Sequence, residues 1–289
     1  MVQTYAIINN ARHGRFLINP NDTYIGQSLK TYGEWGEAEA RLFAKLLRPG
    51  DLVVEAGANI GSLTVPLSRL VGPDGTVIAF EPQRLIFQLL CANAALNDCW
   101  NVDTRQAAVG AVNAEVLMAR VAPNIEANFG SIRVNNGYEH SLGVDQVPLV
   151  TIDSLGLKQL DLIKADVEGF EQAVIEGARD TIARCRPAIY FEHNDLNNWA
   201  VPDLVASLGY DCYLYVTRLW DPHNHMKFAT DIWSQPNIPQ CSLDVLALPH
   251  GGRWRIGGLH LLTRSNPLST SALPIDPDNY VDLPIVERS

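Results

Sequence analysis

Several features that would assign this 289-residue sequence to a particular class are missing from it. Lysine and arginine never form a run, and the formal net charge of −10 disfavours a nucleic-acid partner, which calls for a basic face. No apolar stretch approaches the roughly 20 residues needed to span a bilayer. The N-terminus lacks the succession of basic, apolar and small residues that marks a signal peptide. These absences predict a cytoplasmic protein without a membrane span.

Cysteine pairs are also absent. The five cysteines are odd in number and none of them forms a C-x-x-C pair. Such a pattern is typical of reduced thiols that serve as small core residues, and it agrees with a cytoplasmic location.

The dinucleotide fingerprint G-x-G-x-x-G is missing where a nucleotide-binding corner otherwise begins. Residues 51–61 read DLVVEAGANIG, so that a short buried strand runs into a turn that carries Gly57 and Gly61. Asn59 stands where the fingerprint has its middle glycine, and Glu55 ends the strand. A helical pattern follows from residue 62, and its first N–H groups are expected to point into a pocket.

This corner suits a cofactor with ribose, amine and carboxylate groups but no phosphates, and S-adenosylmethionine is such a molecule. The turn holds no basic residue, and its acidic neighbour favours a positively charged ligand. The residues predicted to contact the cofactor here are Glu55, Gly57, Ala58, Asn59 and Gly61.

A second strand over residues 76–80 ends at Glu81 and Pro82, some 20 residues after the glycine corner. An acidic side chain at that place in the fold accepts hydrogen bonds from ribose hydroxyls. Glu81 and Pro82 therefore join the predicted cofactor site.

Alternation of apolar strands with helical patterns predicts an α/β protein with a doubly wound, mostly parallel sheet. An N-terminal β-hairpin precedes a helix that starts at Glu37, and a β-excursion interrupts the alternation over residues 110–150. The expected strands are 76–80, 101–109, 115–121, 130–134, 188–194, 210–216, 243–248 and 258–262, and the expected helices are 84–96, 170–185 and 201–208.

Three motifs then carry a resemblance to a known family. They are PGDLVVEAGANIG at residues 49–61, LDLIKADVEGFEQAVIEGA at residues 160–178 and RPAIYFEHN at residues 186–194. Together they resemble the FkbM family of S-adenosylmethionine-dependent methyltransferases, and the similarity covers about residues 34–248. Two positions depart from the family pattern: Glu55, where relatives often have aspartate, and Glu192-His193-Asn194, where they commonly have E-N-D.

The resemblance implies the class I methyltransferase fold, a Rossmann-like sheet of seven strands whose last strand is antiparallel. It also implies methyl transfer, usually to oxygen. On this basis the chain divides into a β-hairpin extension over 1–36, a class I methyltransferase domain over 37–265 and a C-terminal tail over 266–289.

Carboxylates and one histidine follow the later strands, at the ends that meet beside the cofactor corner. Asp166 and Glu168 are expected to contribute to cofactor binding. A hydroxyl acceptor must lose a proton during methyl transfer, and a nearby base that takes this proton accelerates the reaction. We predict His193 as this base, Asp166 as the residue that orients it or the acceptor, and Glu192 as a third catalytic candidate.

Other roles stay open for the same residues. Asp166 and Glu168 are placed to cap the following helix. Together with Glu192 and His193 they also offer the oxygen and imidazole ligands of a divalent metal. His223 and His225 have suggestive spacing, although a lone H-x-H in a Pro-bearing loop is usually only a loop.

The sequence therefore predicts an S-adenosylmethionine-dependent methyltransferase that acts on a hydroxyl of a small molecule, such as a sugar, a lipid-linked or a polyketide-like metabolite. Two alternatives remain: a nucleotide-dependent oxidoreductase on a related fold, and a cofactor-binding module without catalysis. The acceptor itself and the oligomeric state cannot be deduced from the sequence.

Overall fold

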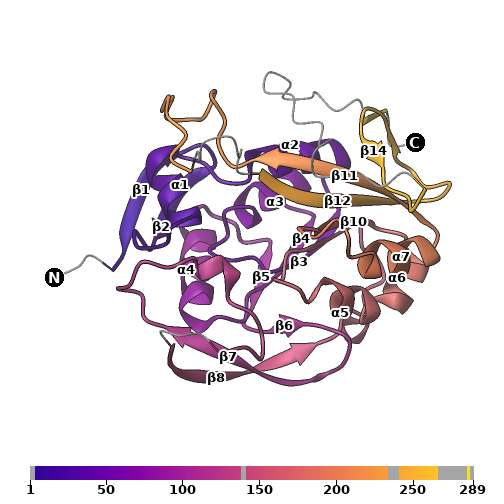
Figure 1. Cartoon of the computed structure of the whole chain (residues 1–289), viewed down its shortest axis with the longest axis horizontal. Helices are drawn as coiled ribbons and strands as arrows, with labels where there is room; N and C mark the ends of the chain where they lie inside the picture. The colour runs from indigo at the N-terminus through magenta and orange to yellow at the C-terminus, as the bar shows by residue number, and fades with distance from the viewer. Residues whose placement is uncertain (1–3, 138–140, 234–240, 266–284, 287–289) are drawn as a thin grey trace.

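The main sheet of the protein has eight strands, in the order β14-β11-β12-β10-β9-β3-β4-β5 (Figure 1). The computed structural model describes residues 4–137, 141–233, 241–265 and 285–286. Strands β3 (Leu52–Ala56), β4 (Thr76–Phe80), β5 (Val102–Arg105), β9 (Leu162–Ala165) and β10 (Ala188–Glu192) run parallel. Strand β12 (Cys241–Pro249) is antiparallel to both β10 and β11 (Tyr210–Arg218).

This arrangement confirms the predicted class I methyltransferase fold: of the seven strands β11, β12, β10, β9, β3, β4 and β5, only β12 is antiparallel to the others. The eighth strand, β14 (His260–Leu261), has two residues and pairs with the outer edge of β11. Because the five parallel strands end at one edge, the polar residues that follow them meet there.

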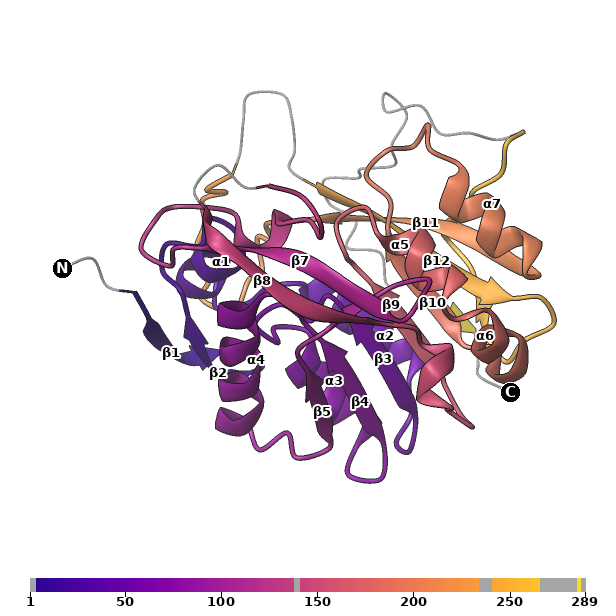
Figure 2. The ribbon, with the colours of Figure 1, turned by 90° about the horizontal axis from the view of Figure 1, so that it is seen from below.

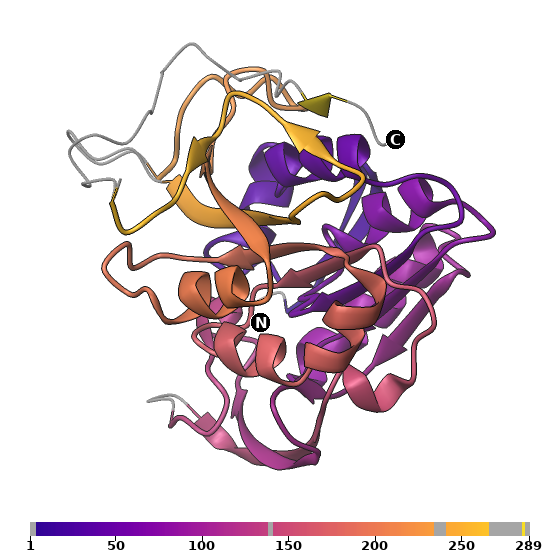
Figure 3. The same cartoon turned by 90° about the vertical axis from the view of Figure 1, so that its right-hand side faces the viewer.

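Helices cover both faces of the sheet. Helices α2 (Glu37–Leu46) and α3 (Thr64–Val71) pack on the face that presents Val53, Leu162 and Tyr190. Helices α5 (Glu171–Glu176), α6 (Arg179–Cys185) and α7 (Ala200–Ser207) pack on the opposite face and lie together in Figure 3. Successive strand residues alternate between these two layers.

The N-terminal extension is attached to the side of α4 (Arg84–Leu96), a helix whose bounds match the prediction. It consists of the hairpin β1 (Ala6–Ala11) and β2 (Gly14–Ile18), followed by α1 (Ile25–Thr31). The Asn93 side chain accepts from Leu17 N (2.6 Å) and donates to Leu17 O (3.0 Å) and Ile60 O (2.8 Å). One buried amide thus joins the hairpin to the loop that follows β3.

The predicted excursion over 110–150 is present, but its strands differ from the prediction. The expected strand 101–109 is split, since β5 ends at Arg105 and β6 (Ala108–Val109) pairs with β8 in another sheet. Strand β7 (Ala114–Val121) agrees with the prediction, and it pairs with β8 (Ser141–Val150), which was not expected (Figure 2). These three strands form a separate sheet beside the main one.

The prediction of a strand over 130–134 was wrong, because a short 3₁₀ turn, η1 (Phe129–Ser131), occupies the start of this segment. The Asn128 side chain accepts a hydrogen bond from Gly130 N, which holds the turn instead of a strand ladder.

The expected helix 170–185 is broken into α5 and α6. Gly177 O accepts from Asp153 N rather than continuing the helix, and the Asp153 carboxylate accepts from Asp180 N and Thr181 N. This carboxylate, from a 3₁₀ turn η2 (Asp153–Leu155), caps the second helix and explains the break.

Most of the predicted tail over 266–289 lies outside the described residues. Within it, β15 (Ile285–Val286) pairs antiparallel with β13 (Arg255–Ile256). The domain boundaries at 36/37 and 265/266 stay predictions.

Replacing Asn93 with Ala should lower the free energy of unfolding by about 2–3 kcal/mol, since it removes hydrogen bonds from buried backbone groups. Chemical denaturation followed by circular dichroism measures this change. The matched control is Asn97→Ala. The Asn97 side chain accepts a hydrogen bond from Arg15 N and donates one to Arg15 O in the same manner, but at an exposed site. A loss at Asn93 no larger than that at Asn97 would contradict the proposed link.

Candidate functional site

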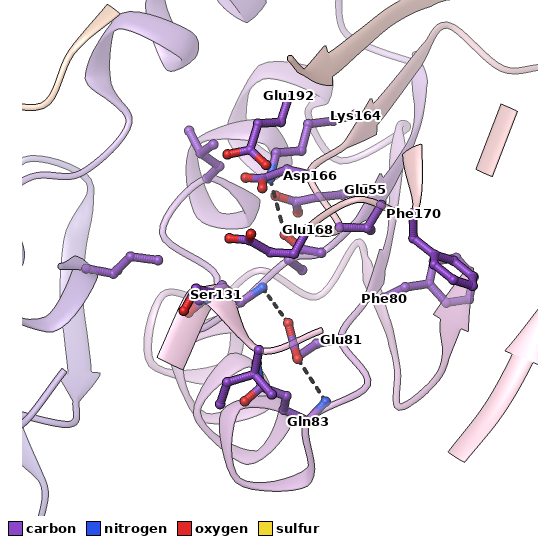
Figure 4. Close-up of a pocket in the computed structure, with 18 of the residues that line it drawn as sticks. Glu55, Phe80, Glu81, Gln83, Ser131, Lys164, Asp166, Glu168, Phe170 and Glu192 are labelled. Carbon is purple, nitrogen blue, oxygen red and sulfur yellow. Dashed lines mark hydrogen bonds and ion pairs between the residues drawn. The ribbon is translucent and has the colours of Figure 1, made fainter. Parts of the chain in front are cut away.

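A cavity of about 410 Å³ opens at the carboxyl ends of β3, β4, β9 and β10. Its walls come from the glycine corner after β3, the corner after β9, the ends of β4 and β10, the start of β12, the excursion and the segment around α1 and α2. Figure 4 shows that Glu55, Lys164, Asp166, Glu168 and Glu192 gather at one end, whereas Glu81 and Gln83 lie at the other. The lining includes every predicted cofactor residue except Gly61.

The N–H groups of the glycine corner are engaged within the protein. Gly57 N and Ala58 N donate to Phe80 O, and Asn59 N donates to the Glu81 carboxylate (3.0 Å). Ile60 N donates to the Asn59 side chain, and Gly61 N donates to Ala58 O. These are not the first N–H groups of α3 (Thr64–Val71), so the expectation that those helical groups point into a pocket stays a prediction. A corner with these donors already used is not a phosphate cradle.

Gly57 brings the two glycine-bearing corners into direct contact. Its φ of +80° is a conformation that other residues rarely adopt. A Cβ atom at this position would lie 1.8 Å from the backbone oxygen of Asp166. The loops after β3 and β9 can thus approach each other this closely only because residue 57 has no side chain.

Glu55 and Lys164 form the floor of the cavity, side by side on neighbouring strands. Glu55 is 0% exposed; Thr64 Oγ1 donates to its Oε2 (2.6 Å), while Oε1 has no partner among the described residues. Burial raises the pKa of Glu55 to about 7, against the opposing effects of Lys164 and Thr64. A buried carboxylate oxygen without a partner, in a cavity wall, fits a ligand donor such as an amine.

Lys164 links the two corners from below. Its Nζ donates to Gly57 O (3.2 Å) and pairs with Asp166 Oδ2 (3.1 Å). Burial favours loss of its proton, but the carboxylates of Asp166 and Glu55 outweigh burial and raise the pKa of Lys164. The ammonium therefore stays charged and holds both loops to β9.

Glu81 is buried, and its two carboxylate oxygens are fixed by backbone donors. Asn59 N donates to Oε2 (3.0 Å) and Gln83 N donates to Oε1 (2.8 Å). Burial raises the pKa of Glu81 to about 7, and these two hydrogen bonds oppose the rise. Each oxygen keeps a lone pair for a further donor, so the geometry fits the pair of ribose hydroxyls assigned to it.

Asp166 and Glu168 line the cavity. Glu171 Oε1 accepts from Val167 N (3.2 Å) and Gly169 N (3.1 Å), which holds the loop before α5, and the N-cap residue Phe170 provides no side-chain cap. Among the described residues neither Asp166 nor Glu168 accepts a hydrogen bond from the start of α5, so the capping role left open for them is not observed. Glu168 has a φ of +52°, and burial beside Asp166 raises the pKa of Glu168 to about 7. Both side chains are therefore available to a ligand.

Glu192 and His193 lie on opposite faces of the sheet. Glu192 lines the cavity with Asn194, on the face that also presents Tyr190. His193 is not among the residues that line the cavity; its ring contacts that of Phe191 on the face covered by α5–α7 (centroids 6.2 Å apart). Burial lowers the pKa of His193. Burial and the carboxylates of Asp166 and Glu168 raise the pKa of Glu192 to about 9.

Among the polar residues of the cavity wall that sequence reasoning missed are Lys164, Tyr190, Glu39 and Asp244. Lys164 belongs to the motif at 160–178, and Tyr190 precedes Glu192 by two positions, so strand alternation was the available signal for both. Glu39, on α2, and Asp244, on β12, carry no local signal, because only the fold brings them to the site. His223 and His225, in contrast, lie outside the cavity wall.

The part of the chain that the structure describes contains no group of three or more His, Cys, Asp or Glu side chains arranged to hold a metal ion. Within the same residues, none of the helices combines the length and apolar character that crossing a membrane requires.

The strand order and the glycine corner together define a class I methyltransferase fold. The family model for the methyltransferase FkbM domain matches residues 55–215, which is more than half of the chain. The chain belongs to this family of S-adenosylmethionine-dependent methyltransferases, as the sequence motifs predicted. A protein described as Methyltransferase 1, from Beauveria bassiana (strain ARSEF 2860), is 28% identical over 177 residues, or 54% of this chain. The match spans 66% of that relative, just under two thirds of its length.

Solved structures give weaker likenesses. A precorrin-6y C5,15-methyltransferase from Geobacter metallireducens GS-15 has a TM-score of 0.45 at 12% identity, over 73% of this chain and 87% of that one. A methyltransferase FkbM from Methylobacillus flagellatus KT has a TM-score of 0.41 at 17% identity, over 78% of this chain and 55% of that one. Likenesses this distant say nothing about the acceptor or the catalytic residues.

Replacing Gly57 with Ala should weaken S-adenosylhomocysteine binding more than tenfold, because the new methyl group forces the corners after β3 and β9 apart. Isothermal titration measures the affinity. Gly50→Ala is the matched control: its φ is +89°, yet a Cβ there would meet nothing within 4 Å. Both variants share the cost of a left-handed alanine, about 1 kcal/mol. Equal affinities in the two variants would show that the close contact is unimportant.

Proposed function

We propose that this protein transfers a methyl group from S-adenosylmethionine to a hydroxyl of a small molecule. The observation that carries the proposal is the hydrogen bonding of the glycine corner, where all five N–H groups from Gly57 to Gly61 are used internally. An adenosine cofactor with phosphates would need those donors, whereas one with ribose hydroxyls and an amine needs the carboxylates that surround them.

The residues of the cavity fit S-adenosylmethionine group by group. Glu81, held by two backbone donors, would accept from the ribose, and the unpartnered Oε1 of Glu55 would accept from the amine. Val109 and Phe170 line the cavity and offer an apolar wall for the adenine. Phe170 is labelled in Figure 4. The bound cofactor supplies a methyl group on a positively charged sulfur, which nearby carboxylates favour.

The chain's own residues would position the acceptor and take up its proton. Alignment of donor and acceptor alone gives effective molarities of about 10⁵ M or more. Lys164 holds Asp166 and the Gly57 carbonyl in place, and both border the space in front of Glu192. We assign the role of general base to Glu192 rather than to the predicted His193, because Glu192 alone of the two lines the cavity.

The function is tested by isothermal titration with S-adenosylhomocysteine and with NADH, followed by transfer of isotopically labelled methyl groups to a panel of hydroxylated metabolites. We expect binding of the first ligand, none of the second, and labelled product from at least one acceptor. Binding of NADH instead would favour an oxidoreductase. Cofactor binding without transfer to any acceptor of the panel would favour a module that lacks catalysis.

Glu192→Gln should lower kcat/KM by about 10²–10⁴-fold with the best acceptor of that panel. Because the raised pKa keeps the proton on Glu192 at neutral pH, the basic form appears as pH rises. The wild-type kcat/KM should therefore increase up to about pH 9, where Glu192 titrates, and the variant should lose this dependence.

The pH dependence of kcat/KM is measured for His193→Gln in the same way as for Glu192→Gln. If this variant abolishes the pH dependence and Glu192→Gln does not, the base is His193 and our assignment is wrong. Asp195→Asn, at an exposed carboxylate outside the cavity wall, controls for the change in charge.

A further inference from the structure

A row of carboxyl groups crosses the sheet beyond Lys164, on the side away from Glu81. Glu192 and Asp244 are direct partners in the antiparallel pair of β10 and β12, so their side chains leave the same face. Glu39, from α2, lines the same part of the cavity. We call Glu39, Glu192 and Asp244 the acceptor carboxyls. They come from three elements that are far apart in the sequence, and none belongs to the glycine corner.

The charge of this part of the cavity is not balanced by the protein. Lys164 is the sole lysine or arginine among the described residues of the lining, and it is bound to Asp166 and Gly57 O. None of the acceptor carboxyls forms an ion pair with any residue that the structure describes. A positive group from a ligand would fill this deficit.

Two buried polar groups of the chamber face each other. Asp244 is 4% exposed and Tyr190 is 2% exposed, and each affects the pKa of the other. Neither Asp244 Oδ2 nor the Tyr190 hydroxyl completes a hydrogen bond among the described residues, and both side chains line the cavity. Buried polar atoms are nearly always satisfied in native proteins, so this incompletely bonded pair in a cavity wall indicates a ligand that bonds to it.

We propose that the acceptor is an amino alcohol whose protonated amine binds between Asp244 and Glu39, with its reacting hydroxyl next to Glu192. This inference rests on the proposed methyltransferase function. An ammonium group donates three hydrogen bonds and carries the positive charge that the chamber lacks. Tyr24 and Trp35, on the wall contributed by the α1 segment, offer aromatic surface that also suits a cation.

Other acceptor classes fit less well. A phosphorylated or carboxylated acceptor would meet Glu39 and Asp244 without a free cation among the described lining residues, and its negative charge would oppose the ionisation of both carboxyl groups. A neutral polyol would satisfy Tyr190 and Asp244 but leave the charge of the chamber uncompensated. Burial and the carboxylates of Glu39 and Asp166 raise the pKa of Asp244, which is the effect that a bound cation would reverse.

The test measures binding of small probes to the protein saturated with S-adenosylhomocysteine. Two sets are used, each of which compares a neutral polyol with an amino and a carboxylate derivative of it: glucosamine, glucose and glucuronate, and serinol, glycerol and glycerate. We expect the two ammonium compounds to bind at millimolar concentration, at least tenfold more tightly than their neutral partners, and the anions to bind more weakly still.

Asp244→Asn should remove the preference for ammonium compounds and leave the affinity for S-adenosylhomocysteine unchanged. Asp195→Asn makes the same change of charge outside the cavity wall and should keep the preference. Glu39→Gln, on a helix rather than in the sheet, repeats the test if Asp244→Asn does not fold.

The proposal is overturned if neutral or anionic probes bind as tightly as the ammonium compounds, or if no ammonium compound binds. It is also overturned if the preference survives both substitutions. Failure of S-adenosylhomocysteine to bind the wild-type protein is a separate result, which would instead refute the methyltransferase function.

Discussion

The close contact between Gly57 and the carbonyl of Asp166 is the constraint on which the site depends. It places the corner after β3 against the corner after β9, and Lys164 secures both with one ammonium group. The carboxylates of Glu55, Asp166 and Glu168 are thereby concentrated at one end of a cavity whose other end is set by Glu81. A cavity rich in carboxylates is costly for a fold unless a cationic ligand offsets the repulsion, and the family to which the chain belongs uses such a cofactor.

The backbone of the glycine corner illustrates how similar turns serve different ligands. In a phosphate-binding loop the amide protons face the ligand, whereas here the end of β4 and its Glu81 take three of them. The hydrogen bond from Asn59 N also orients the Glu81 carboxylate. In the proposed cofactor site, the backbone N–H donors are thus already used, while a carboxylate acceptor is held in place for the ligand.

Much of the fold was readable from local patterns, because the apolar strands and α4 have periodicities that tertiary contacts do not override. The glycine corner and Glu81 were also readable, since their roles follow from position relative to a strand end. The prediction for His193 neglected alternation: a residue next to Glu192 on a strand points to the other face. Asp244 and Glu39 could not be found, because only the pairing of β12 with β10 and the packing of α2 bring them near Glu192. The break at Gly177 depends on Asp153, which lies 24 positions away and gives no local signal.

Asn93 has a consequence for how the chain can be divided. The side-chain amide of Asn93 forms hydrogen bonds with Leu17 of the hairpin and with Ile60 of the corner after β3. Ile60 in turn packs in one apolar cluster with Phe16 and Ile18 of the hairpin. Removing residues 1–36 would therefore leave the buried Asn93 amide without its partners at Leu17 and expose Ile60. The truncated chain would also lack the cavity residues Tyr24, Ile25 and Trp35, and the corner after β3 would lose the packing that supports it.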